Sequence, residues 1–176
     1  MKTKWLLAKL LLVALILAGC ASRPKEFRSA AGKFSVEAPI PLKEQVQPID
    51  TPAGKIDAHI FMAESKTIAY VVAYADYPEQ VVSQSNPELV LNGARDGMVG
   101  NVNGKLVLET RITINNYPGR EVVVDVKMPD GKDGTVKARL YLVKNRLYQV
   151  EVVTTKGEVA ITTINSFLDS FKLIGE

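Results

Sequence analysis

Hydrophobic and polar residues alternate along most of this chain, and the period of the alternation predicts its secondary structure. Residues 33–38 and 55–63 place hydrophobic side chains at every second position, which predicts two half-buried strands. The segment between them contains Pro48 and Pro52 and is predicted as a loop. Residues 67–75 are hydrophobic on both faces, so we expect a central strand that is covered on both sides.

The period changes to that of a helix in two places. Asn86, Pro87 and Glu88 are typical of a helix start, because they supply a capping side chain, a preset φ and an acid near the positive end of the helix dipole. Hydrophobic residues then recur at helical spacing and predict a helix over residues 87–99. The same spacing predicts a second helix over residues 158–171, where a packed face outweighs the low helix propensity of the β-branched residues.

Four more strands are predicted between these helices, because hydrophobic and polar residues alternate again. They span residues 106–114, 122–126, 136–142 and 147–154. Asparagine, proline and glycine mark turns at 115–119 and 129–134, and the last turn falls at Lys144–Asn145 or Asn145–Arg146. The predicted order is βββαββββα, an α+β fold with one mainly antiparallel sheet of about seven strands.

The first 20 residues differ in composition from the rest. Residues 1–19 place lysines ahead of a short hydrophobic run and end on small residues, as signal peptides do. The run is about half of the roughly 20 residues that a membrane-spanning helix needs. Leu17-Ala18-Gly19-Cys20 resembles the bacterial lipoprotein box, which implies cleavage after Gly19 and lipid attachment at Cys20. Two or more acyl chains anchor a protein stably to a membrane.

Cys20 is the only cysteine, so it forms no disulfide within the chain, and a cysteine-based zinc site is not expected. The alternatives to lipid attachment are a free thiol in a secreted protein and a cytosolic protein with a buried N-terminal helix. Removing the predicted signal peptide leaves 157 of the 176 residues, enough for one hydrophobic core. It also leaves 19 basic and 19 acidic residues and no basic stripe, so we expect no nucleic-acid partner.

Several short motifs resemble those of the PsbP-like superfamily, which includes small DcrB-like lipoproteins. They are Phe34-Ser35-Val36 before Pro39, Ala94-Arg95-Asp96-Gly97, Pro118-Gly119-Arg120-Glu121, Arg139-Leu140-Tyr141-Leu142-Val143 and Phe167-Leu168-Asp169-Ser170-Phe171-Lys172-Leu173. The resemblance covers about residues 27–174 and implies an α/β/α sandwich, an accessory or assembly role at extracytoplasmic membranes, and no shared catalytic residues. We therefore expect a signal peptide at 1–19, a lipidated linker at 20–26 and one PsbP-like domain at 27–176.

The sequence offers little for catalysis or metal binding, and we expect neither an enzyme nor a cofactor. Asp57 and His59 share a strand face and are candidates for an acid–base pair or a metal site, although a solvated sheet face is the simpler interpretation. A hydrolase triad would have to use His59, and no Gly-x-Ser-x-Gly motif is present. The turn from Asp130 to Gly134 lacks the acid spacing of a calcium loop and is explained by turn chemistry.

Two sets of side chains are candidates for binding. Charged residues of the later strands are expected to share one sheet face: Glu109, Arg111, Glu121, Asp125, Lys127, Lys137 and Arg139. Among charged residues, the candidates for contacting a protein partner are Arg95, Asp96, Arg111 and Arg139, against the simpler interpretation of solvated surfaces with cross-strand pairs. The candidates for lining a pocket are Tyr70, Tyr74, Tyr141 and Tyr148, against the simpler interpretation of core packing.

Together these patterns predict a non-catalytic lipoprotein that is anchored to an envelope membrane by its lipid. There it is expected to support the assembly or maintenance of an envelope protein complex. Ala21 stands where an aspartate would suggest retention in the inner membrane, so the outer membrane is favoured, with the domain facing the periplasm. The alternative from another class is a small-ligand binding module with a tyrosine-lined pocket. A hydrolase built around His59 is the remaining alternative.

Overall fold

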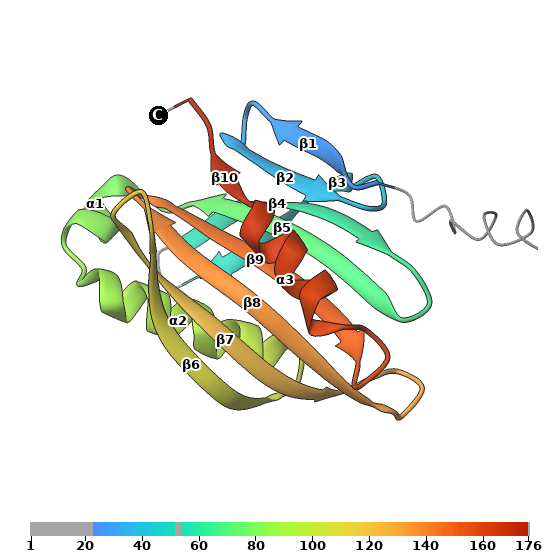
Figure 1. Cartoon of the computed structure of the whole chain (residues 1–176). Helices are drawn as coiled ribbons and strands as arrows, with labels where there is room; N and C mark the ends of the chain where they lie inside the picture. Colours follow the sequence, from blue (N-terminus) through green and yellow to red (C-terminus); the bar gives the residue numbers. More distant parts are fainter. Residues whose placement is uncertain (1–22, 52–53, 176) are drawn as a thin grey trace, which may run out of the picture.

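Seven antiparallel strands form the main sheet of the computed structural model, which describes residues 23–51 and 54–175 (Figure 1). In spatial order they are β3 (Lys43–Thr51), β4 (Gly54–Glu64), β5 (Ile68–Asp76), β9 (Arg146–Thr155), β8 (Asp133–Val143), β7 (Tyr117–Lys127) and β6 (Lys105–Ile114). A smaller sheet joins β1 (Lys25–Ser29), β2 (Phe34–Ala38) and β10 (Lys172–Leu173). The helices of the described residues are α1 (Glu79–Ser83), α2 (Pro87–Asn101) and α3 (Ile161–Ser170).

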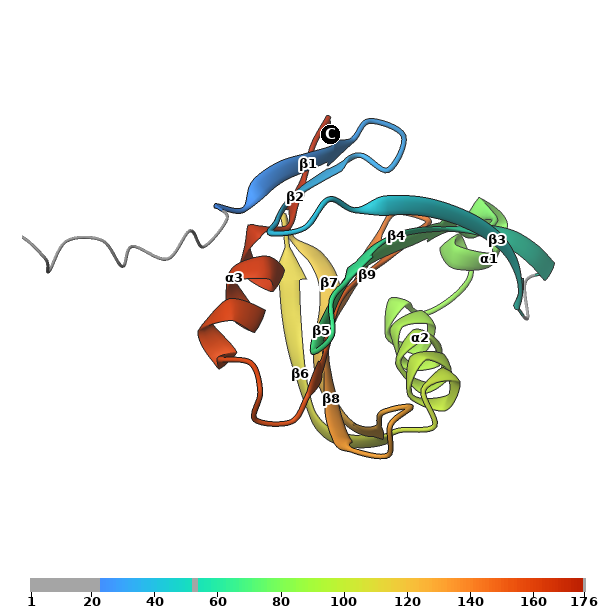
Figure 2. The same cartoon turned by 90° about the vertical axis from the view of Figure 1, so that its right-hand side faces the viewer.

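The elements form three layers. Helix α3 and the small sheet cover one face of the main sheet, and α2 lies on the opposite face (Figure 2). This arrangement buries the hydrophobic side of each element against another one. The structure therefore confirms the predicted α+β fold with helices on both sides of a mainly antiparallel sheet of seven strands.

Aromatic side chains dominate the core between the main sheet and α3. The ring centroid of Phe34 on β2 lies 5.3 Å from that of Phe61 on β4 and 5.7 Å from that of Phe171, which follows α3. Tyr148 on β9 packs with its ring centroid 5.5 Å from that of Phe171. Since burial of one such side chain contributes about 1.5–3 kcal/mol, these rings hold the small sheet against the main one.

Tyr148 also links two segments that are distant in sequence, because its buried hydroxyl donates a 2.7 Å hydrogen bond to the carbonyl oxygen of Gly32. Tyr148→Phe removes this donor, so we expect the free energy of unfolding to fall by about 1–2 kcal/mol, measured by urea denaturation. Tyr117→Phe is the control, because the half-buried Tyr117 makes no hydrogen bond through its hydroxyl within the described residues. Equal losses in the two variants would contradict the prediction.

The first strands differ from the prediction. The predicted strand at residues 33–38 is β2, which belongs to the small sheet, and the segment predicted as a loop contains β3, an edge strand of the main sheet. The residues of β3 are exposed or half-buried, so the strand lacks hydrophobic alternation. Pro48 is tolerated there because an edge strand pairs on one side only. The short elements β1, α1 and β10 were not predicted either.

Strand β5 is fully covered on one side only, whereas the sequence predicted cover on both. Tyr70, Val72 and Tyr74 are buried in the core on the α3 side. The alternate residues Val71 and Ala73 point to the α2 side and are only half-buried. The reason is that α2 packs over β7 and β8 and leaves this part of the sheet open.

Candidate functional site

Helix α2 separates two hollows on its face of the sheet, and its own sequence fixes its position. The Asn86 side chain accepts a 2.9 Å hydrogen bond from the backbone N–H of Glu88, and Pro87 is the first helical residue, as predicted. Leu91 and Met98 are the buried residues of the helix and belong to the core that includes the valines of β7. The helix therefore lies firmly on the half of the sheet formed by β7 and β8.

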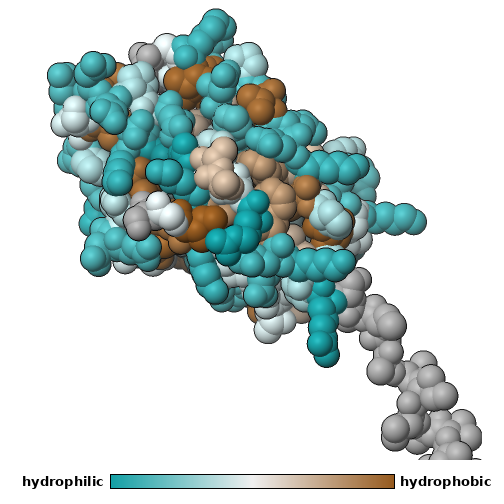
Figure 3. Space-filling view, turned by 90° about the horizontal axis from the view of Figure 1, so that it is seen from above, coloured by the Kyte–Doolittle hydropathy of each residue, from teal (hydrophilic) through white to brown (hydrophobic). Residues whose placement is uncertain are grey.

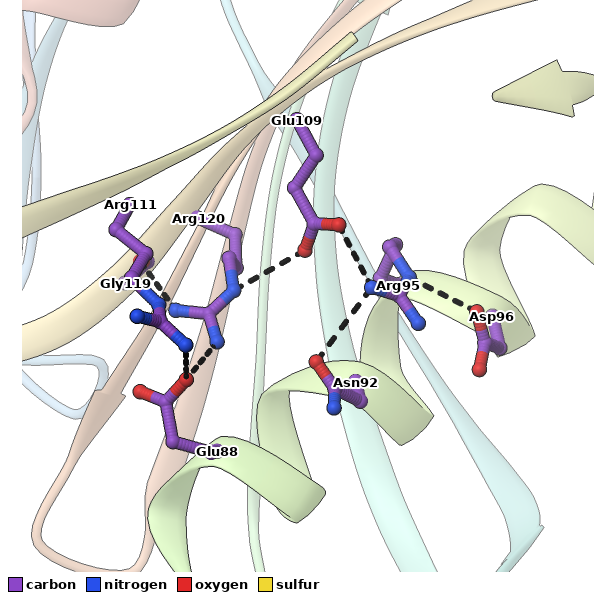
Figure 4. A network of polar contacts seen from close by, with 8 residues as sticks. All are labelled: Glu88, Asn92, Arg95, Asp96, Glu109, Arg111, Gly119 and Arg120. Carbon is purple, nitrogen blue, oxygen red and sulfur yellow. Dashed lines mark hydrogen bonds and ion pairs between the residues drawn. The ribbon is translucent and has the colours of Figure 1, made fainter. Parts of the chain in front are cut away.

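A cluster of charged side chains lies where α2 faces β6 and β7 (Figure 4). At its centre is Arg120 of β7, whose side chain is 4% exposed. Its guanidinium contacts the Glu88 carboxylate of α2, and its Nε lies 3.1 Å from Oε1 of Glu109 on β6. It also donates a 3.1 Å hydrogen bond to the carbonyl oxygen of Gly119. The Arg120 guanidinium lowers the pKa of Glu88, so this carboxylate stays ionised.

Two further arginines complete the cluster. Arg95 of α2 donates hydrogen bonds of 2.7 Å to Glu109 and 2.9 Å to Asp96. Nη2 of Arg111 lies 3.1 Å from Oε2 of Glu88. The structure thus brings Arg95, Asp96 and Arg111 together, as three of the four charged residues expected to contact a partner. Their charges are already paired, so the cluster mainly fastens α2 to β6 and β7, although Arg111 keeps 79% of its side chain exposed.

Arg139, the fourth of these residues, lies on the opposite face of the sheet. It donates hydrogen bonds of 2.8 Å to Glu121 and 2.6 Å to Asp169 of α3. The charged residues predicted to share one face are therefore divided between two. The cause is the turn between β6 and β7, which contains only Asn115 and Asn116 and sets a register that places Arg111 opposite Arg120, on the α2 side.

The four candidate pocket tyrosines lie in the core on the α3 side. They are between 2% and 5% exposed: Tyr70, Tyr74, Tyr141 and Tyr148. The ring centroids of Tyr74 and Tyr148 are 6.3 Å apart, and Tyr141 stacks on Phe171 at 5.9 Å. This is the core packing that the sequence favoured. Of the hollows described for residues 23–51 and 54–175, none is lined by Tyr70, Tyr74 or Tyr141.

His59 stacks on Tyr74 with ring centroids 4.6 Å apart, and its Nδ1 lies 3.0 Å from Oε1 of Glu44 on β3. The acid beside His59 is therefore Glu44, while Asp57 lies two residues away on the same strand. Within residues 23–51 and 54–175, no three His, Cys, Asp or Glu side chains are grouped to hold a metal ion. These contacts supply a packed aromatic surface and provide no nucleophile for His59.

A groove of about 600 Å³ runs along the other side of α2. Strand β3 lies across from this side of the helix (Figure 2). Ile49 of β3 lines one wall, α2 forms the other wall, and Leu147 and Gln149 of β9 lie between them. Leu89 stands at the edge of the groove on α2 and is 67% exposed. The open part of β5 continues this hydrophobic surface beyond the groove.

The wall formed by α2 contains Gly93 and Gly97, and both residues line the groove. Among the described residues, no atom outside the helix lies within 4 Å of the position that a Cβ would take at either residue. Glycine in a helix interior costs roughly 0.5–1 kcal/mol relative to alanine, and packing within the described chain does not explain that cost here. Their absent side chains leave room along the groove.

Glu151 lies next along β9 from the groove. Leu147, Gln149 and Glu151 are alternate residues of one strand and therefore point to the same side of the sheet. The half-buried Glu151 lies between Val71 of β5 and Ala138 of β8 in the strand register. Within the described residues its carboxyl group makes no hydrogen bond or ion pair, and burial raises its pKa to about 7. Glu151 could not be singled out from the sequence, because one acid in an alternating strand indicates only an exposed position.

A further hollow, of about 450 Å³, lies at the small sheet where the described chain begins. Arg23, Phe27 and Ile40 are among its lining residues. Figure 3 looks down on this end of the molecule and shows hydrophobic surface, in brown and tan, between hydrophilic side chains. Cys20 and the predicted signal peptide lie outside the described residues. Within the described part of the chain, no helix has the length and hydrophobicity needed to span a membrane.

Comparison with known proteins identifies neither a family nor a function. The sequence matches no protein-family model and no curated protein. A crystal structure from Bacteroides thetaiotaomicron VPI-5482 aligns with 88% of this chain at a TM-score of 0.49 and 14% identity, and this chain spans half of that one. PA94 of Pseudomonas aeruginosa, a protein of unknown function, aligns over 77% of this chain and 85% of its own at a TM-score of 0.38 and 12% identity.

Proposed function

We propose that this chain is a non-catalytic lipoprotein, anchored at Cys20 to the outer membrane and facing the periplasm, that binds a segment of a protein partner in the groove beside α2. The groove is the observation that carries the proposal, because it exposes hydrophobic surface that residues 23–51 and 54–175 do not cover. The partner belongs to an envelope complex that the protein helps to assemble or maintain. The lipoprotein box and the PsbP-like motifs support the location and the accessory role.

The groove suits a partner better than the charged cluster does. Binding energy in protein interfaces is concentrated in desolvated hydrophobic contacts, whereas paired surface charges contribute little. Two hydrophobic residues that line the groove, Leu89 and Val81, are exposed to solvent. The exposed Arg111 lies on the other side of α2 and can extend the contact at its rim. The buried tyrosines offer the small-ligand alternative no comparable space.

The lipid anchor is tested by metabolic labelling with palmitate. We expect the label to enter the wild-type protein and not the Cys20→Ser variant, and we expect only the wild type to sediment with membranes. Two or more acyl chains give stable anchoring, so the difference in sedimentation should be nearly complete. An unlabelled wild type, or a Cys20→Ser variant that sediments unchanged, would refute the anchor without bearing on the groove.

The partner site is tested by placing a photo-cross-linking amino acid at Leu89 in intact cells. Leu108 is the matched control, because it is also an exposed leucine, at 54%, and lies on β6 away from the groove. We expect one defined envelope protein to be cross-linked from position 89 and not from position 108. Identical products from both positions would contradict the proposed site.

Gly97→Leu separates binding from folding. The open space at Gly97 accepts a side chain, and leucine favours the helix, so we expect the free energy of unfolding to rise by about 0.5–1 kcal/mol. The same side chain narrows the groove, so we expect the cross-link from position 89 to be lost. Thermal or urea denaturation measures the first effect. Retained cross-linking in a stabilised Gly97→Leu protein would show that the partner binds elsewhere.

A further inference from the structure

The groove beside α2 has one acidic residue among its described lining residues, and a second acid lies next to it. Within the described residues, no lysine or arginine lines it. Its lining acid, Asp50, is already paired with Lys55, with an Oδ1 to Nζ distance of 3.0 Å. Glu151 lies next to the groove on the same side of β9 and has no such partner within the described residues. Of these two acids, Glu151 is therefore the one whose carboxyl group has no charged partner within the described residues.

The surroundings of Glu151 make its isolation costly. Its neighbours in the strand register, Val71 and Ala138, are hydrophobic, and so are Leu147 and Val153 on the same side of β9. A carboxylate withdrawn from water among such side chains is destabilised unless a hydrogen-bond donor or a cation compensates it. The described residues place neither a hydrogen-bond donor nor a cation at Glu151. A bound partner could supply one.

We propose that the partner segment is hydrophobic and carries a lysine or arginine whose charge pairs with Glu151. This inference rests on the proposed function and names the chemistry of the segment that occupies the groove. Hydrophobic residues of the segment contact Leu89, Ile49 and the open face of β5. The long stem of a lysine or arginine lies along these apolar walls while its charged end reaches the carboxylate. Pairing at Glu151 would select and orient the segment, since a hydrophobic groove alone discriminates weakly.

The first test compares three short peptides that differ only at the central residue: acetyl-Ala-Leu-Lys-Leu-Ala-amide and its glutamine and glutamate counterparts. Each is titrated by NMR at pH 8 into the full-length lipoprotein in nanodiscs. We expect the lysine peptide to bind about tenfold or more tightly than the glutamine peptide, as a charge-assisted hydrogen bond implies. Glu151→Gln should remove this preference while leaving the glutamine peptide bound as before.

The outcomes separate the inference from the proposed function. Equal binding of the lysine and glutamine peptides to the wild type, or a lysine preference that persists in Glu151→Gln, overturns the role of Glu151 and leaves the groove as a binding site. Failure of all three peptides to bind overturns both proposals. Gln149→Ala is the control variant, because Gln149 lines the groove and carries no charge, so the lysine preference should survive there.

The second test identifies the natural occupant. A photo-cross-linking amino acid at Gln149 in intact cells should capture a peptide with a lysine or arginine between hydrophobic residues, and the yield should fall at least tenfold when Glu151→Gln is added. A captured peptide without a basic residue overturns the inference. Capture of a second copy of this chain, or of a lipid or other small molecule, also overturns it.

Discussion

Arg120→Met is expected to lower the free energy of unfolding by about 3 kcal/mol. Removing one partner of a buried ion pair costs about 3–5 kcal/mol, because the remaining charge keeps its desolvation cost and loses its compensation. The lower end applies here because the Glu88 and Glu109 side chains that Arg120 bridges are 37% and 25% exposed. Without Arg120, Glu88 and Glu109 would each keep one arginine partner, Arg111 and Arg95, and so have less compensation. Urea denaturation measures the loss.

Arg111→Met is the matched control for this prediction. Arg111 contacts the same Oε2 atom of Glu88, but 79% of its side chain is exposed, so water screens the pair. We expect a change within about 0.5 kcal/mol. In Arg120→Met combined with Glu88→Gln, part of the loss should be recovered, since the neutral amide removes a carboxylate whose remaining partner, Arg111, is exposed to water. If Arg120→Met lowered the free energy of unfolding no more than Arg111→Met does, the charged cluster would not hold α2 on the sheet.

Glu151→Gln is expected to raise the free energy of unfolding at pH 8 by about 2–3 kcal/mol. The folded protein holds the Glu151 pKa at about 7, against an ordinary value of 4.5, because burial disfavours the charged form. A tenfold change in the proton-binding constant between the unfolded and folded states corresponds to about 1.4 kcal/mol, and the partial exposure of Glu151 reduces the total. Glutamine has nearly the same shape and no charge, so it avoids this cost.

The pH dependence of the free energy of unfolding tests the effect of Glu151 independently. Between pH 4.5 and 7 the folded chain binds more protons at Glu151 than the unfolded chain, so the stability of the wild type falls as the pH rises through this window. Above pH 7 the contribution of Glu151 levels off. The free energy of unfolding of Glu151→Gln should equal that of the wild type near pH 4, and the difference in favour of the variant should grow up to pH 7. The exposed Glu64→Gln is the control, and an identical difference in both variants would exclude a special role for Glu151.

Elements with a strong hydrophobic period were predictable from the sequence. The start of α2 was found from Asn86 and Pro87, because capping chemistry is local, and the strands of the β6 to β9 meander follow from alternation and turn residues. Strand β3 was missed because its side chains are mostly exposed, so its sequence has no hydrophobic alternation. Its backbone hydrogen bonds to β4 hold it in the extended conformation. Its position at the edge is a property of the assembled sheet.

The candidate site was predicted only in part, for a similar reason. Arg95 and Arg111 were singled out as charged surface residues. Their respective partners, Glu109 and Glu88, come from different elements and are bridged by Arg120 only in the fold. The two-residue turn at Asn115 and Asn116 decides which charges face α2, and a shift of one residue would reverse the faces. The groove itself results from where α2 lies on the sheet, which no local pattern specifies.

The small sheet joins the two ends of the described chain, because β10 pairs with β2 through Leu173 opposite Phe34. These partners are about 140 positions apart, and contacts between such distant residues form slowly. The small sheet cannot form completely before β10 is available, so we expect its completion to be a late step in folding.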